Sequence, residues 1–120
     1  MSRPYRYIAF ERRGDVFCVR IQQKRLDEPM LLAMADEVRN LVTESGCRKM
    51  ALSLGPESPE CLYSMFLAKL ISIQRLLHEH QGELVLCYVQ PAVHDIFASC
   101  CLDQLFHFMP DYEAAVSYFG

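Results

Sequence analysis

The 120-residue sequence lacks the features that mark several common classes of protein. Its five glycines stand alone, so there is no glycine-rich loop of the kind that cradles a phosphate. No apolar stretch reaches the roughly 20 residues that a membrane helix needs, because Lys69, Gln74 and Asp95 interrupt the longest candidates. No pair of carboxylates is set in the apolar context that acid and base catalysis often uses. We therefore expect a non-enzymatic, soluble, cytoplasmic protein with no membrane partner.

Cysteine and histidine are present, but not in the spacing of a metal site. The six cysteines include no Cys-x-x-Cys pair, and the four histidines form no spaced ligand set with them. We expect neither a metal nor another cofactor. Most of the cysteines lie in apolar runs and no secretory leader precedes them, so they are predicted to be buried free thiols of a reducing compartment. The adjacent Cys100 and Cys101 are predicted to be two ordinary thiols.

The charges give little reason to expect a nucleic-acid partner. Twelve basic and fifteen acidic residues leave a net charge of -3, and only the segment from Arg3 to Arg25 is locally basic. Its basic residues alternate with apolar ones, which is more typical of the solvated faces of two strands than of a phosphate-binding patch. With 52% hydrophobic and 22% charged residues, the chain has the composition of a folded protein of one domain.

The spacing of apolar residues predicts an α/β fold. Strands are expected at 5–11, 16–21, 49–54, 84–89 and, at an edge, 105–109. Helices are expected from Asp27 to Gly46, at 64–80, at 91–101 and from Pro110 to Tyr118. Helical crossovers make the later strands parallel. The result is a single domain with a mixed sheet of four to five strands and about four helices packed on it, with the apolar run at 16–21 central and covered on both faces.

Four short segments, in this order, carry a resemblance to a known family. They are Leu26-Asp27 before the first helix, the strand at 50–55 that ends in Ser-Leu-Gly, the Gly-x-Leu-x-Leu strand at 82–86, and Leu-Asp-Gln-Leu-Phe at 102–106. Together they resemble the STAS domain, the family of sulphate-transporter cytoplasmic domains and bacterial anti-sigma factor antagonists. The resemblance spans nearly the whole chain, so residues 1–120 are expected to form one STAS-like domain.

The resemblance also implies a partner and a modification site. Typical antagonists carry Asp-Ser-Ser-Gly where the loop enters the long helix, and an anti-sigma kinase phosphorylates the second serine. If the loop holds one extra residue, the aligned segment is Leu62-Tyr63-Ser64-Met65, in which only Ser64 matches. Ser53 replaces the usual strand aspartate, and Lys24 replaces a glycine common before the first helix. Ser64 is the phosphorylation candidate, although we expect its hydroxyl first of all to cap the start of the helix.

The loop and helix start around Ser64 form the predicted docking surface. We expect a protein partner, an anti-sigma factor or a serine kinase, to contact Gly55, Pro56, Glu57, Ser58, Tyr63, Ser64, Met65 and Phe66. Tyr63 is expected to precede the helix, and Met65 is turned about 100° from Phe66, so these two are the best contact candidates while Phe66 can instead fill the core. Two alternatives remain: a STAS-like domain that binds a nucleotide, flavin or lipid, and a homodimer through the apolar first half of the helix at 64–80.

Overall fold

The structure, a computed structural model, describes residues 5–120, so Arg3 and its neighbours at 1–4 lie outside the described residues. The elements in chain order are β1 (Ile8–Arg13), β2 (Val16–Ile21), β3 (Arg25–Leu26), α1 (Glu28–Thr43), β4 (Lys49–Ser53), β5 (Glu60–Cys61), α2 (Tyr63–Glu79), β6 (Glu83–Cys87), α3 (Pro91–Ser99), β7 (His107–Met109) and α4 (Tyr112–Phe119). Apart from β3 and β5, this is the predicted order of strands and helices.

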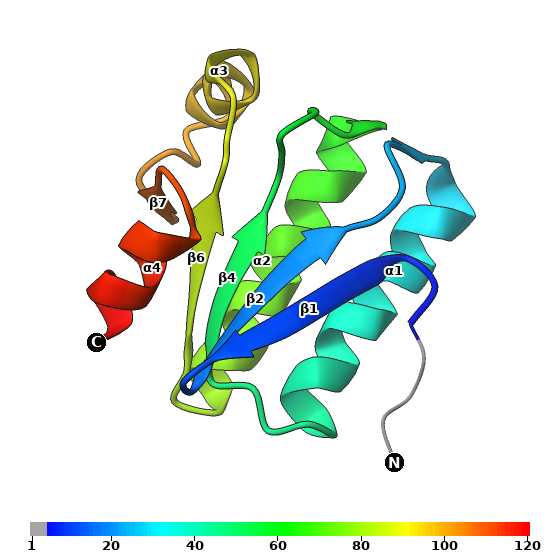
Figure 1. Ribbon diagram of the computed structural model, residues 1–120. Coiled ribbons are helices and arrows are strands. Elements are labelled where there is room, and N and C mark those ends of the chain that lie inside the picture. The colour runs from blue at the N-terminus through cyan, green and yellow to red at the C-terminus, as the bar shows by residue number, and fades with distance from the viewer. Residues whose placement is uncertain (1–4) are drawn as a thin grey trace.

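One mixed sheet of five strands organises the fold, in the order β1-β2-β4-β6-β7 (Figure 1). The hairpin of β1 and β2 is antiparallel, and β2, β4, β6 and β7 are all parallel. The predicted α/β class, the parallel later strands and the edge position of β7 are therefore confirmed. The two-residue strands β3 and β5, which pair in parallel, were not expected, because segments this short give no periodic signal.

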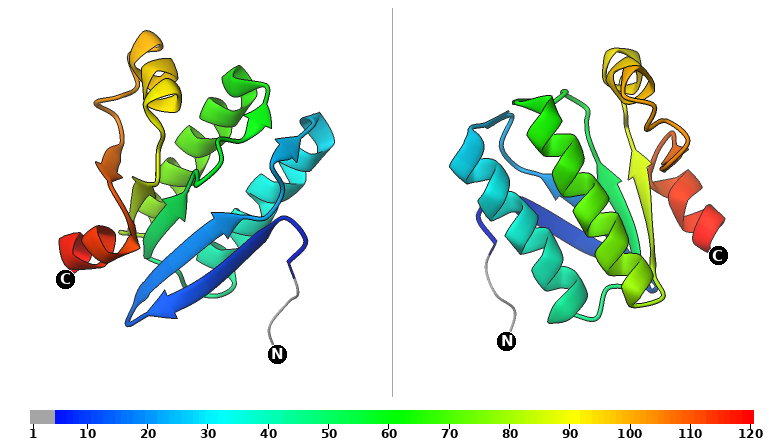
Figure 2. Two further views of the ribbon diagram at one scale, coloured as in Figure 1. Left: turned by 45° about the horizontal axis from the view of Figure 1, so that its top comes forward. Right: turned by 180° about the vertical axis from the view of Figure 1, so that it is seen from behind.

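The two faces of the sheet carry side chains of different size. Helices α1 and α2 cover one face and α4 covers part of the other (Figure 2). Toward α1 and α2 the strands present Phe17, Val19, Met50, Leu52, Leu84 and Leu86. Toward α4 they present Val16, Cys18, Ala51, Val85 and Cys87, against which Ala115 packs. The central strands are buried on both faces, which explains why their sequences are continuously apolar rather than alternating.

Strand β1 begins at Ile8, three residues later than the sequence indicates. The backbone N–H groups of Arg6, Tyr7 and Ile8 donate instead to the carboxylate of Glu37 on α1, at 2.9, 2.8 and 3.1 Å. A single acidic side chain thus fixes the path of the chain into the sheet. The pattern of the first strand could not reveal this, because Glu37 lies about 30 residues away.

The cysteines differ in how deeply they are buried, which corrects the prediction that they are buried thiols. Cys18, Cys47 and Cys87 are buried, whereas Cys61 is half-buried and Cys100 and Cys101 are exposed; all six are free thiols. Burial raises the pKa of both Cys47 and Cys87 to about 12, so these thiols stay protonated at neutral pH. The exposed pair follows α3, which ends at Ser99, two residues earlier than predicted.

Within residues 5–120, no helix combines the length and the apolar composition needed to cross a membrane. The same residues hold no group of three or more His, Cys, Asp or Glu side chains arranged to bind a metal ion.

Candidate functional site

Three connections meet at the carboxyl ends of the parallel strands, at the top of the sheet in Figure 1. They are the β2–α1 connection, the β4–α2 loop at residues 54–62, and the β6–α3 connection at 88–90. Because β2, β4 and β6 run in the same direction, these segments lie side by side with the β4–α2 loop in the middle. The predicted docking surface is on this middle loop.

The base of the β4–α2 loop is fixed by Ser53 and Gly55. The Ser53 hydroxyl donates to the Gly55 carbonyl at 2.9 Å and accepts from the Gly55 N–H at 3.2 Å. The backbone of Tyr88 in the β6–α3 connection passes so close that a Cβ on Gly55 would lie 2.5 Å from the Tyr88 carbonyl oxygen. Ser53, which stands where the resembled family has aspartate, therefore shapes the loop from a buried position.

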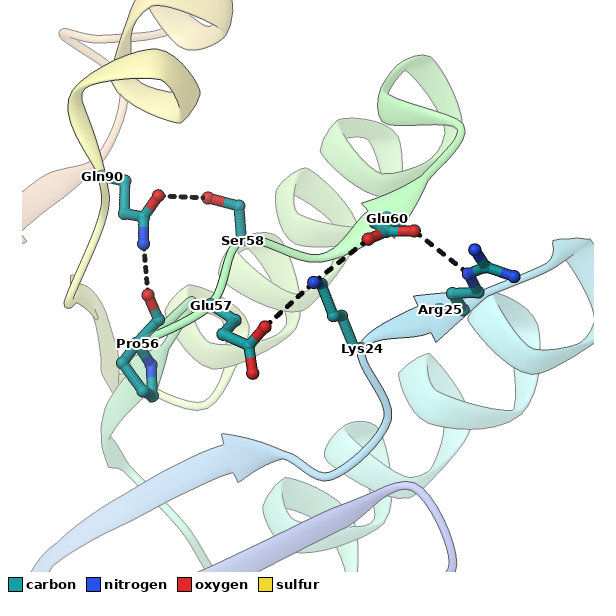
Figure 3. A network of polar contacts seen from close by, with 7 residues as sticks. All are labelled: Lys24, Arg25, Pro56, Glu57, Ser58, Glu60 and Gln90. Carbon is teal, nitrogen blue, oxygen red and sulfur yellow. Dashed lines mark hydrogen bonds and ion pairs between the residues drawn. The ribbon is translucent and has the colours of Figure 1, made fainter.

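Gln90 fastens one side of the loop to the connection before α3. Its side-chain N–H donates to the Pro56 carbonyl, and its side-chain oxygen accepts a hydrogen bond from the Ser58 hydroxyl at 2.9 Å (Figure 3). A single glutamine thus holds the loop at two points.

Charged groups of the β2–α1 connection fasten the other side (Figure 3). The Lys24 ammonium lies 2.9 Å from the Glu57 carboxylate and 3.3 Å from that of Glu60, and Arg25 Nε lies 3.1 Å from Glu60. The hydrogen bonds to Glu57 and Glu60 raise the pKa of Lys24, and those from Lys24 and Arg25 lower the pKa of Glu60. Both directions favour the charged forms, so Lys24 and Glu60 are ionised at neutral pH.

Helix α2 begins at Tyr63, one residue earlier than predicted, with Leu62 as its N-cap. Tyr63 is therefore the first helical residue and not part of the loop, and its hydroxyl donates to the Pro59 carbonyl at 2.7 Å. Ser64 lies inside the first turn, on the surface. The expectation that Ser64 caps the helix was wrong, because the contact between Tyr63 and Pro59 and the pairing of β5 bring the chain into the helix earlier.

Leu62 is an unusual residue for the start of the longest helix. The residue is 60% exposed, its aliphatic side chain makes no cap hydrogen bond, and the first turn of α2 carries no acidic residue. In contrast, Asp27 and Asp111 cap α1 and α4 through hydrogen bonds of 2.9 and 2.8 Å. A leucine in place of such a cap costs about 1 kcal/mol of helix stability. The sequence reading missed Leu62; the signal was a large apolar residue where a polar cap is expected.

The predicted surface residues differ in their accessibility. Pro56, Glu57 and Ser64 are exposed, and Gly55, Ser58, Tyr63 and Met65 are half-buried. Phe66 has no exposed surface and packs in the core under the edge of the Tyr63 ring, with 5.7 Å between ring centres. Of its two predicted roles only core filling agrees with this burial, and direct contact with a partner does not.

A groove separates the β4–α2 loop from α3. Its lining includes Cys61 and Tyr63 on one side and Val93 and Ile96 of α3 on the other. Burial raises the pKa of Cys61 to about 11, so its thiol stays protonated at neutral pH. Leu62 is not among the residues that line this groove, although Cys61 and Tyr63 on either side of it are.

Several solved structures have a fold similar to that of this chain. No protein-family model matches the sequence. An anti-sigma factor antagonist (STAS) domain protein from Planctomyces limnophilus has a TM-score of 0.77 and 20% identity, over 94% of this chain and 98% of its own. A serine-to-glutamate variant of RsbS from Moorella thermoacetica has a TM-score of 0.75 and 18% identity, over 92% of each chain. The anti-sigma factor antagonist SpoIIAA in its unphosphorylated form has a TM-score of 0.70 and 14% identity, over 93% and 96%. At these identities the likeness concerns the fold.

Proposed function

Because the chain has the STAS fold of anti-sigma factor antagonists, we propose that it is a regulatory protein-binding domain that docks on an anti-sigma factor or a serine kinase. We place the contact at a docking surface defined as residues 55–58 and 62–65, with Leu62 at its centre. The observation that carries the proposal is the exposed Leu62 at the N-cap of α2. Leu62 is thus added to the docking residues expected from the sequence, and Phe66 is removed from them because it is buried.

Leu62 supports binding because its place in the structure works against stability. A serine or aspartate side chain there could accept a hydrogen bond from an N–H of the first turn, as Asp27 does from Met30 in α1. What supports a contact role is that an apolar side chain stands where a polar one would be more stable, since stability is often given up at functional positions. Met65 lies one turn along the same helix, and the exposed Pro56 and Glu57 stand on the neighbouring loop. This combination of an apolar centre with polar surroundings is that of a protein interface.

A Leu62→Ser variant separates binding from folding. We expect it to be more stable than the wild type by about 1 kcal/mol, because serine can cap α2, and yet to bind the partner at least about tenfold more weakly, because the apolar anchor is lost. Urea denaturation measures the first effect. Titration calorimetry with the purified anti-sigma kinase of the same genome measures the second.

Leu32→Ser is the matched control, since Leu32 is also exposed, at 41%, but lies on α1. We expect Leu32→Ser to leave the partner affinity within a factor of about two, as is usual for surface positions outside an interface. Equal affinities of wild type and Leu62→Ser would remove Leu62 from the docking surface.

Ser64 is the residue at which we propose phosphorylation. It is exposed in the first turn of α2, where a phosphoryl group would be stabilised by the positive end of the helix and would add up to about two negative charges to the docking surface. Incubation with the same kinase and ATP should yield one phosphopeptide, covering Ser64, that is absent from Ser64→Ala. Undiminished labelling of Ser64→Ala would place the modification elsewhere and leave the docking proposal standing.

The structure gives less support to the two alternatives. In α/β sheets, nucleotides usually bind where the strand order reverses and helices diverge to opposite faces. Here the five strands follow one another in chain order, and α1 and α2 lie on the same face, so the described residues contain no such reversal. A homodimer through the first half of α2 would need its apolar residues, but Phe66, Leu67 and Leu70 are buried within the domain.

A further inference from the structure

We infer that Lys24 and Glu60 form a charge clamp that presets the position of Leu62 and so prepares the docking surface for its partner. The clamp itself is a property of the free protein. Its role in docking rests on the proposed function, so the two are tested by separate measurements below.

Glu60 is the centre of this clamp. Its carboxylate contacts Lys24 at 3.3 Å and Arg25 at 3.1 Å, while its backbone N–H donates to the Lys24 carbonyl at 2.7 Å. Lys24 also contacts Glu57 at 2.9 Å, so its ammonium spans the loop from Glu57 to Glu60 (Figure 3). The backbone pairing of β3 with β5 and the ion pairs of Glu60 with Lys24 and Arg25 therefore hold the same two segments together.

The clamp acts on Leu62 through both of its neighbours. On one side, Cys61 belongs to β5, which Glu60 anchors to β3. On the other, Tyr63 is tied to Pro59 by its hydroxyl, and Pro59 lies between the two clamped glutamates. The backbone of Leu62 is thus held from both ends, although its side chain is largely exposed. Lys24 and Glu60 are positioning residues, because they act through the backbone that presents Leu62.

A preset loop matters for association because ordering a segment on binding weakens the complex. Single exposed ion pairs contribute little, and the side chains of Lys24 and Glu60 are about half exposed, at 49% and 48%. Here two cations and two carboxylates join in one cluster that also includes a backbone hydrogen bond, which is the arrangement in which exposed charges have a measurable effect. Salt should weaken the clamp, because such pairs are screened.

A Lys24→Met variant tests the clamp in the free protein, by hydrogen exchange of the Glu60 amide. We expect this amide to exchange about three- to tenfold faster in Lys24→Met, and likewise faster in the wild type at 1 M salt than at 0.05 M. Lys24→Arg should retain slow exchange. The Gly55 amide, which donates to Ser53 in the same loop, should keep its rate and serves as the internal reference.

Lys49→Met is the matched control variant. Lys49 makes a comparable ion pair, 2.8 Å from Asp15, at the start of β4 and so at the other end of the sheet. Its removal should leave the Glu60 amide unchanged. If Lys24→Met and Lys49→Met give the same Glu60 exchange rate, the clamp is overturned, whatever the partner does.

Titration of Lys24→Met with the anti-sigma kinase tests the role in docking. We expect an affinity roughly three- to tenfold lower, with wild-type affinity in Lys24→Arg and Lys49→Met. Faster Glu60 exchange together with unchanged affinity would overturn the role in docking and leave the clamp. Failure of the kinase to bind wild-type protein would instead contradict the proposed function, because the exchange experiment needs no partner.

Discussion

Replacing Phe66 with alanine should lower the free energy of unfolding by about 3 to 5 kcal/mol. The side chain has no exposed surface, packs in the main core and meets the edge of the Tyr63 ring, so its removal leaves a cavity directly beneath the docking surface. Urea denaturation followed by circular dichroism measures the loss. Because small domains are stable by only about 5 to 15 kcal/mol, the measurement should be made well below the melting temperature of the wild type.

Met65→Ala is the comparison variant, because Met65 is the neighbour of Phe66 on α2 but is only half-buried. Met65 is half-buried and belongs to the docking surface, so this variant should lose about 1 kcal/mol or less of stability while binding the partner more weakly. If Phe66→Ala had the same urea midpoint of unfolding as the wild type, Phe66 would not be a core residue.

A Gly55→Ala variant should lose about 1 to 3 kcal/mol of unfolding free energy, because the added Cβ cannot be accommodated without moving backbone. It would lie 2.5 Å from the carbonyl oxygen and 3.0 Å from the Cβ of Tyr88. Tyr88 cannot easily retreat, since its hydroxyl accepts the Tyr112 N–H at 3.3 Å and its ring lies edge-on to that of Tyr112. Tyr112 is held in turn by a 2.8 Å hydrogen bond from its hydroxyl to the Val19 carbonyl.

The strain in Gly55→Ala should therefore displace the β4–α2 loop, and partner binding should weaken together with stability. Gly14→Ala provides the contrast. Gly14 has a φ of +64° but open space around it, so alanine there should cost about 1 kcal/mol through backbone conformation alone and should leave binding unchanged. Wild-type stability of Gly55→Ala would mean that the loop tolerates the close approach of Tyr88.

Much of the fold was accessible from the sequence because the signals that define it are local. Asp27, expected at the start of the first helix, caps α1, and Gly46, with a φ of +73°, ends the segment after it. Helix α4 was also expected, although it begins at Tyr112 after the cap Asp111 and not at Pro110. The continuously apolar runs at β2, β4 and β6 indicated strands buried on both faces. Hydrophobic periodicity and helix caps involve residues only a few positions apart, so both can be recognised in a single sequence.

The candidate site was only partly accessible from the sequence. The sequence pointed to the β4–α2 loop and to Ser64, which is exposed, but it placed Tyr63 outside the helix and passed over Leu62. A serine is normally the better cap, so local rules favoured a helix that starts at Ser64. The observed start depends on Tyr63 reaching Pro59 and on β5 pairing with β3, and only the second of these joins distant parts of the chain.

By itself the sequence thus determined the order of strands and helices, the cap of α1 and the apolar core, since each follows from residues a few positions apart. Only the tertiary structure decided that Leu62 stands in solvent, that Phe66 does not, and that Lys24 and Gln90 hold the same loop from opposite sides. Those contacts join residues about 30 positions apart. Side chains so far apart in the sequence come into contact only when the parallel strands bring their carboxyl ends to one edge of the sheet. A local sequence pattern therefore cannot predict these contacts.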